Sequence, residues 1–140
     1  MYDNVLVPLD GSPVDEAILD HVARLAPIHG SRIVLLRVAQ HWAAKYYGEN
    51  AMPKEVEEAE EYLEEAAQRL RKAGIEVETV LGHGDPTDVI VREAEERGCD
   101  LIAMSTHGHK GFLDLLYGSV SHGVRHTVDI PVLLIRGKRD

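Results

Sequence analysis

Short apolar runs alternate with amphipathic segments along almost the whole chain. Five runs are rich in Val, Leu and Ile, as buried strands are, and a segment of helical periodicity lies between each run and the next. The predicted strands cover residues 3–9, 31–38, 76–81, 100–104 and 131–136, and the predicted helices, with their caps, cover residues 12–30, 54–73, 85–98 and 119–127. This order predicts an α/β fold, a doubly wound five-stranded parallel sheet with helices on both faces and right-handed crossovers.

The first and third predicted helices begin with the same pattern. Ser12 and Asp85 are N-cap residues, each is followed by a proline, and an acidic side chain follows in the first turn. Gly30 predicts a left-handed cap at the end of the first helix. The alternation of polar and apolar residues over 76–81 indicates an edge strand, whereas the other runs are more continuously apolar.

The length and the cysteine content limit the class of protein. The chain has 140 residues, and we expect a single domain over residues 1–140. Its one cysteine, Cys99, excludes an internal disulfide and is typical of a reducing compartment. Strand-like sequence from Asp3 leaves no room for a signal peptide, and no apolar run approaches the ~20 residues of a membrane span. We therefore expect a cytoplasmic protein that is not inserted in a membrane.

The charge distribution argues against a nucleic-acid partner. The formal net charge is −9, and seven glutamates lie between Glu55 and Glu65 on the outer face of the second predicted helix. Such a run is typical of a solvated helix face. The sequence has no basic stripe of the kind that nucleic-acid binding requires.

One long irregular segment, residues 39–53, contains Trp42, Tyr46 and Tyr47. In a compact domain a loop of this length is usually functional or disordered. We expect it to move or become ordered on ligand binding, with a change in Trp42 fluorescence.

The segment from Cys99 to Val124 combines the features of an anion-binding site. An apolar run ends at Met104, a loop with two glycines follows, and Gly118 and Ser119 stand where a helix is predicted to begin. Glycines let the backbone approach a ligand, and the first N–H groups of a helix are unpaired donors. This arrangement favours a ligand that carries phosphate.

The spacing Ser105-x2-Gly108-x9-Gly118-Ser119 resembles the G-x2-G-x9-G-[S/T] loop of the ATP-binding universal stress proteins, with Ser105 in place of the first glycine. The resemblance extends to the segments from Val5 to Ser12 and from Ile130 to Ile135. It implies a Rossmann-like sheet, similar to the adenine nucleotide alpha hydrolases, with strand order 3-2-1-4-5. It also implies a universal stress protein domain that acts as a nucleotide-dependent regulatory or protective module in the stress response.

The resemblance also implies ligands and their contacts. The implied ligands would be ATP and Mg²⁺, in a cleft between the first and fourth strands. Asp10 would lie near the ribose or act as the ligand of the phosphate-bound Mg²⁺, and Val38 and Met104 would contact the adenine. The candidate site residues are Pro8, Leu9 and Asp10 at the end of the first strand, Val38, Met104, and the phosphate-binding segment with Ser105, Gly108, His109, Lys110, Gly118, Ser119 and Val120. His109 and Lys110 are candidates for the γ-phosphate, although the motif does not require them.

Two of these positions have a second interpretation. Asp10 also suits a turn cap before the first helix. At position 105 a serine would be costly if the backbone needs a positive φ or a bare Cα, but it would add a hydrogen bond if a small side chain suffices.

Functions of other classes remain as alternatives. One is a dimeric interaction module of the same kind that does not bind nucleotide, and another is a slow ATPase. Adenylyl transfer is disfavoured because Asp10-Gly11-Ser12-Pro13 replaces the motifs of such enzymes, and a phosphoacceptor role is disfavoured because the third strand ends without an aspartate. We expect no catalytic residues.

Eight histidines also suggest a metal site. His107-x-His109 and His122-x3-His126 have the spacing of metal ligands, but solvent-exposed histidines are the favoured interpretation.

The last predicted strand, from Pro131 to Arg136, is apolar on both faces and comes last in the sheet. An exposed apolar edge strand aggregates unless it is paired. We expect a homodimer through this strand, as is common in the family.

Overall fold

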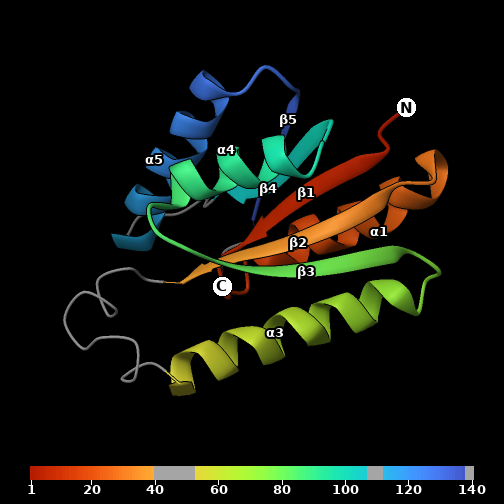
Figure 1. Ribbon diagram of the computed structural model, residues 1–140, viewed down its shortest axis with the longest axis horizontal. Helices are drawn as coiled ribbons and strands as arrows, with labels where there is room; N and C mark the ends of the chain where they lie inside the picture. The colour runs from red at the N-terminus through yellow and green to blue at the C-terminus, as the bar shows by residue number, and fades with distance from the viewer. Residues whose placement is uncertain (40–52, 107–111, 138–140) are drawn as a thin grey trace.

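The computed structural model describes residues 1–39, 53–106 and 112–137, and these residues form a parallel sheet covered by helices (Figure 1). The strands are β1 (Asn4–Leu9), β2 (Arg32–Ala39), β3 (Glu76–His83), β4 (Leu101–Thr106) and β5 (Val132–Arg136). All neighbouring strands are parallel, and the order is β3-β2-β1-β4-β5. The predicted fold class and strand order are confirmed, as are the edge positions of the third and the last strand.

The four described helices cover the sheet in pairs. They are α1 (Asp15–His29), α3 (Pro53–Arg71), α4 (Pro86–Glu96) and α5 (Phe112–Thr127). Figure 1 shows α4 and α5 on one face of the sheet, and α1 and α3 on the other. The crossovers between parallel strands place the helices there, as the alternating pattern of the sequence predicts.

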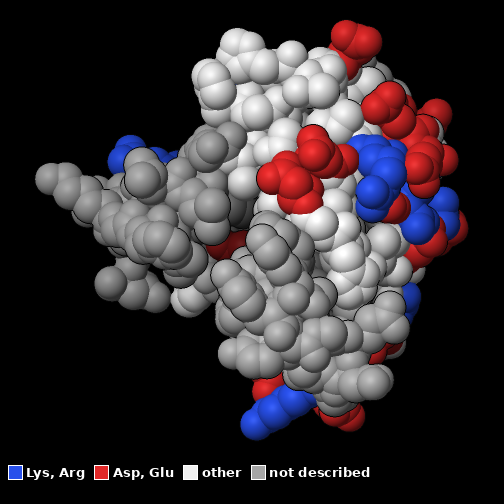
Figure 2. Space-filling model, turned by 60° about the vertical axis from the view of Figure 1, so that its left-hand side comes forward, with Lys and Arg blue, Asp and Glu red and all other residues white. Residues whose placement is uncertain are grey.

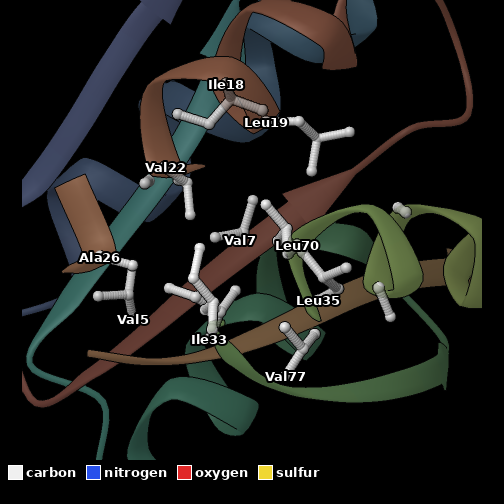
Figure 3. Close-up of a cluster of buried hydrophobic side chains, with 14 of the residues drawn as sticks. Val5, Val7, Ile18, Leu19, Val22, Ala26, Ile33, Leu35, Leu70 and Val77 are labelled. Atoms are coloured by element: carbon white, nitrogen blue, oxygen red, sulfur yellow. The ribbon is translucent and has the colours of Figure 1, made fainter. Parts of the chain in front are cut away.

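Each face of the sheet has its own core because successive side chains of a strand point to opposite faces. Val5 and Val7 of β1 pack with α1 and α3, and Figure 3 shows this core. Leu6 of β1 packs instead with α4 and α5, in a cluster that includes Met104 of β4 and Val124 of α5. With so few aromatic residues in the chain, both cores consist largely of Val, Leu, Ile and Ala.

The predicted helix caps are largely as expected. Asp85 caps α4, where its side chain accepts from the Asp88 N–H at 3.2 Å, and Gly30 adopts φ 66° after α1. At the start of α1, however, Ser12 and Pro13 lie before the helix, in a turn whose first bond runs from the Asp15 N–H to the Ser12 carbonyl at 3.0 Å. Such i to i+3 bonds tighten the entry, so the regular helix begins at Asp15.

The prediction that the last helix begins at Ser119 is wrong. α5 begins at Phe112, so Gly118 and Ser119 lie within it. Residues 112–117 contain three leucines and no glycine or proline, and a single helical glycine costs only about 1 kcal/mol relative to alanine. Because N–H groups beyond the first turn have partners in the helix, the N–H groups of Gly118 and Ser119 are not the unpaired donors that the sequence suggested.

Candidate functional site

The carboxyl ends of β1 and β4 form the switch point of this sheet, where the chain changes its winding direction. β1 and β4 pair through Val5 with Leu101 and Leu6 with Ile102. By contrast, β1 pairs with β2 over its whole length, from Asn4 to Leu9. The β1–β4 ladder thus ends before either strand does, and the two strands continue as the edge where ligands bind in sheets of this kind.

Five predicted site residues come together here, and we call them the switch-point edge: Pro8, Leu9, Asp10, Met104 and Ser105. Their side chains do not all face the same way. Leu9 belongs to the core under α1 and α3, and Met104 belongs to the core under α4 and α5. Val38 and Val120 pack in the same cluster as Met104. The predicted adenine contacts Val38 and Met104 therefore lie on one face of the sheet, opposite Leu9.

The structure decides between the two interpretations of Ser105, a costly side chain or a small side chain that adds a hydrogen bond. It is fully buried, and its hydroxyl donates to the carbonyl oxygen of Val14 at 3.0 Å. Among the described residues no amino acid other than glycine has a positive φ, so the serine causes no backbone strain. The position accepts a small side chain that adds a hydrogen bond, and this bond joins β4 to the entry of α1.

Asp10 forms the turn bond that the sequence allowed. Its Oδ1 accepts from the Ser12 N–H at 2.8 Å, which is the geometry of an aspartate that caps its own turn. The residue is half-buried at the end of β1. A carboxylate can accept several hydrogen bonds, so this contact and a ligand contact are compatible.

A second carboxylate, that of Asp15, lies buried beneath the same turn, and sequence reasoning assigned it only to the first turn of a helix. Asp15 accepts from the Asp10 N–H at 3.1 Å and from the Gly11 N–H at 2.9 Å. The hydroxyl of Tyr62, from α3, donates to it as well. A buried acid six residues after a strand end has no distinctive spacing, so the sequence offered no signal for this cluster.

The environment of Asp15 favours its neutral form. Burial, and secondly the charge of Asp10, raise the pKa of Asp15 to about 7, although the bonds from Tyr62, Asp10 and Gly11 act in the opposite direction. Burial and the bond to Asp15 also raise the pKa of Tyr62, so its hydroxyl stays protonated.

Arg37 of β2 completes the cluster on the side of α3. Its guanidinium lies 5.2 Å from the centroid of the Tyr62 ring, within the range of a cation–π contact. Gly11 has φ +84°, and a Cβ there would lie 2.6 Å from the Cζ of Arg37. Only glycine allows the turn and the guanidinium to approach so closely.

We predict that the raised pKa of Asp15 makes the fold less stable as the pH rises. The folded state holds a proton that the unfolded state has lost between the unfolded pKa of about 3.8 and the folded pKa of about 7, so the associated stability is present at low pH and is lost as the pH approaches 7. Between pH 5 and pH 8 the free energy of unfolding should fall by on the order of 3 kcal/mol relative to Asp15→Asn. Urea unfolding at several pH values measures this, and parallel pH profiles of the two proteins would contradict it.

Several predicted residues lie outside the described residues. These are Trp42, Tyr46, Tyr47, His107, Gly108, His109 and Lys110, so the first histidine pair also lies outside this part of the chain. For Gly118 and Ser119 the structure describes the helical backbone. The prediction that residues 39–53 respond to ligand thus falls mostly on residues that the structure does not describe.

The second histidine pair lies on α5. The rings of His122 and His126 are 4.3 Å apart, and both residues are exposed. Within residues 1–39, 53–106 and 112–137 no three His, Cys, Asp or Glu side chains are grouped to hold a metal ion.

No helix in this part of the chain is long and apolar enough to cross a membrane. The basic side chains at the right of Figure 2 lie among acidic ones.

The sheet order, the paired helix layers and the switch-point edge define a doubly wound α/β protein of the Rossmann-like kind. The model of the universal stress protein family matches residues 1–136, and the chain belongs to this family.

Individual relatives and solved structures agree with this assignment. Universal stress protein MJ0577 of Methanocaldococcus jannaschii is 31% identical over 157 residues, an alignment that covers 99% of this chain and 97% of the relative. The solved structure of MJ0577 superposes with a TM-score of 0.86 at 29% identity, covering 100% of this chain and 99% of that one. The universal stress protein of Archaeoglobus fulgidus, solved in complex with dAMP, superposes with a TM-score of 0.74 at 25% identity, covering 96% of this chain and 98% of that one.

Proposed function

We propose that this protein is a nucleotide-dependent regulatory module, a single domain that binds ATP with Mg²⁺ at the switch-point edge. The observation that carries the proposal is the early end of the β1–β4 ladder, which leaves an edge with apolar side chains on one face and a carboxylate at its end. The dAMP complex of the Archaeoglobus fulgidus protein supports an adenine nucleotide as the class of ligand.

Adenine fits the face that carries Val38 and Met104. Both side chains pack in the cluster under α4 and α5, where Met104 is fully buried, whereas Val38, at the end of β2, is only half-buried and offers apolar surface. A flat apolar ring gains free energy by covering such exposed apolar surface. Pro8 and Leu9 would hold the neighbouring strand end, while backbone groups would fix the orientation of the base.

The phosphates and Mg²⁺ would lie beyond the strand ends. Mg²⁺ prefers carboxylate oxygens together with phosphate and water, and the Asp10 carboxylate suits this role. The segment from Ser105 to Val120, with Gly108, His109 and Lys110, would contact the phosphates. Ser105 would contribute only backbone groups because its hydroxyl is engaged by the Val14 carbonyl.

The proposal is tested by the nucleotide that the protein retains and binds. Protein purified without added ligand is denatured, and the released nucleotides are identified by mass spectrometry. Calorimetric titrations then compare ATP with Mg²⁺, ATP with a chelator, and AMP. We expect the tightest binding for ATP with Mg²⁺, and no binding of any adenine nucleotide would contradict the proposal.

One observation favours a second function, a dimeric interaction module that does not bind nucleotide. Because α5 begins at Phe112, the N–H groups of Gly118 and Ser119 lie in the helix interior. The phosphates would then meet the side of a helix at Gly118 and Ser119 instead of a helix start.

Gly118→Val tests whether the phosphates lie against this part of α5. Valine is not a worse helix former than glycine, so α5 should remain folded. If the phosphates lie against Gly118, the added side chain should weaken Mg²⁺-ATP binding by at least about tenfold. His122→Val, at an exposed position of the same helix, is the control. Unchanged affinity in a folded Gly118→Val protein would place the phosphates elsewhere, whereas a wild-type protein that binds no nucleotide would favour the interaction module.

We also predict a homodimer that pairs through β5. This strand lies at an edge of the sheet, and its apolar side chains, from Val132 to Ile135, are only half-buried. Pairing would cover an edge that is otherwise prone to aggregation. Sedimentation at micromolar concentration should show a dimer, and Leu134→Lys should shift it toward monomer. A wild-type protein that sediments only as a monomer would rule this out.

A further inference from the structure

The hydrogen bonds of Asp15 are directed away from its own helix. A carboxylate at a helix start usually accepts from the first N–H groups of that helix. Here the first three N–H groups of the helix donate instead to the backbone carbonyls three residues earlier, those of residues 12, 13 and 14. The Asp15 carboxylate instead accepts from the N–H groups of Asp10 and Gly11, which precede the helix. Its role therefore concerns the turn after β1.

The same carboxylate ties this turn to a third element. The Tyr62 hydroxyl donates to it from α3, and the Tyr62 ring lies against the Arg37 guanidinium, which in turn packs on Gly11. The charged and titratable groups that face Asp15 are thus Asp10 from the turn, Tyr62 from α3 and, through Tyr62 and Gly11, Arg37 from β2. Together they hold the turn between two strands and two helices.

Burying a carboxylate is costly unless its hydrogen bonds are well satisfied. Asp15 is fully buried, and both of its oxygens have partners. A neutral serine or threonine would hold a turn with one acceptor at less cost. The carboxylate, by contrast, fixes two consecutive N–H groups, and thereby the backbone from which the Asp10 side chain projects.

We propose that Asp15 is a positioning residue of the nucleotide site: its buried carboxylate, braced by Tyr62, fixes the Asp10–Gly11 turn and so aims the Asp10 carboxylate at the nucleotide. This inference rests on the proposed function. Asp15 itself touches no ligand. Its effect passes through Asp10. A carboxylate that the turn already holds in the binding orientation loses less conformational entropy when the ligand binds.

The test is a double-mutant cycle on Mg²⁺-ATP affinity, measured by calorimetry with Asp10→Ala, Asp15→Ala and the double variant. Asp15→Ala removes both acceptors and should weaken binding by about tenfold. Asp15→Asn, which keeps one acceptor oxygen, should restore part of the affinity. Because Asp15 acts through Asp10, the double variant should bind no more weakly than Asp10→Ala alone.

Asp20→Asn is the matched control. Asp20 is another α1 carboxylate in contact with α3, where it pairs with Arg69, but it is exposed and lies away from the turn. We expect it to leave the Mg²⁺-ATP affinity unchanged. Without ligand, the amide protons of Asp10 and Gly11 should exchange faster in Asp15→Ala than in the wild type. In Asp20→Asn they should exchange at the wild-type rate. Circular dichroism confirms folding of each variant.

The outcomes separate the two claims. A wild-type protein that binds no adenine nucleotide would overturn the proposed function, and the positioning role with it. Wild-type binding together with an unchanged affinity in folded Asp15→Ala would overturn the positioning role alone. Additive losses in the double-mutant cycle would also overturn it, since they would show that Asp15 affects Mg²⁺-ATP binding without acting through Asp10.

Discussion

Val38→Trp is expected to weaken Mg²⁺-ATP binding by about a hundredfold, because the indole would occupy the space proposed for the adenine and remove its apolar contact. Val38 is suited to this test since it lies at the carboxyl end of β2 and is only half-buried in the cluster with Met104. Calorimetric titration of the variant against the wild type measures the effect.

Val80→Trp is the control for the bulk of the new side chain. Val80 lies on β3, is half-buried and packs against the same cluster. Its register partner on β2 is Leu36, however, which lies two residues before Val38. The affinity of the Val80→Trp variant for Mg²⁺-ATP should stay within about twofold of that of the wild type. Equal losses in both variants, or none in Val38→Trp, would show that the adenine does not lie against β2.

Leu35→Ala is expected to lower the free energy of unfolding by about 2–5 kcal/mol, the range for a fully buried leucine that leaves a cavity. Leu35 has no exposed surface and lies in the core between the sheet, α1 and α3 (Figure 3). Urea denaturation measures the change.

Ile28→Ala provides the contrast. Ile28 is 78% exposed on α1, so its truncation should change stability by less than about 0.5 kcal/mol. If both variants are equally stable, the core between the sheet and these two helices does not hold the fold together as the structure indicates.

The sheet was predictable because local signals and tertiary packing agree there. Continuous apolar runs are what a strand covered on both faces requires, so β1, β2 and β4 were visible in the sequence. The N-cap of α4 at Asp85 also depends on residues close in sequence, and it forms as predicted. The strand order, by contrast, came from the family resemblance.

The candidate site was less predictable because it depends on contacts between distant residues. The start of α5 was misplaced since Gly118-Ser119 has the chemistry of a helix start, whereas the preceding leucines continue the helix. The partner of Ser105, the Val14 carbonyl, lies on another element and leaves no mark in the local sequence. Asp15 and Tyr62 are separated by most of two helices and a strand, so their pairing is a property of the fold alone.

The most direct test of the proposed nucleotide site is the methyl NMR signal of Met104 during a titration with Mg²⁺-ATP. The chain has three methionines, Met1, Met52 and Met104, so the methyl spectrum is simple to assign by substitution. The aromatic ring current of a bound adenine should shift the Met104 signal, while the signal of Met1, which is 86% exposed, should stay in place. A Met104 signal that does not move at saturating Mg²⁺-ATP would contradict the claim that the nucleotide binds between β1 and β4.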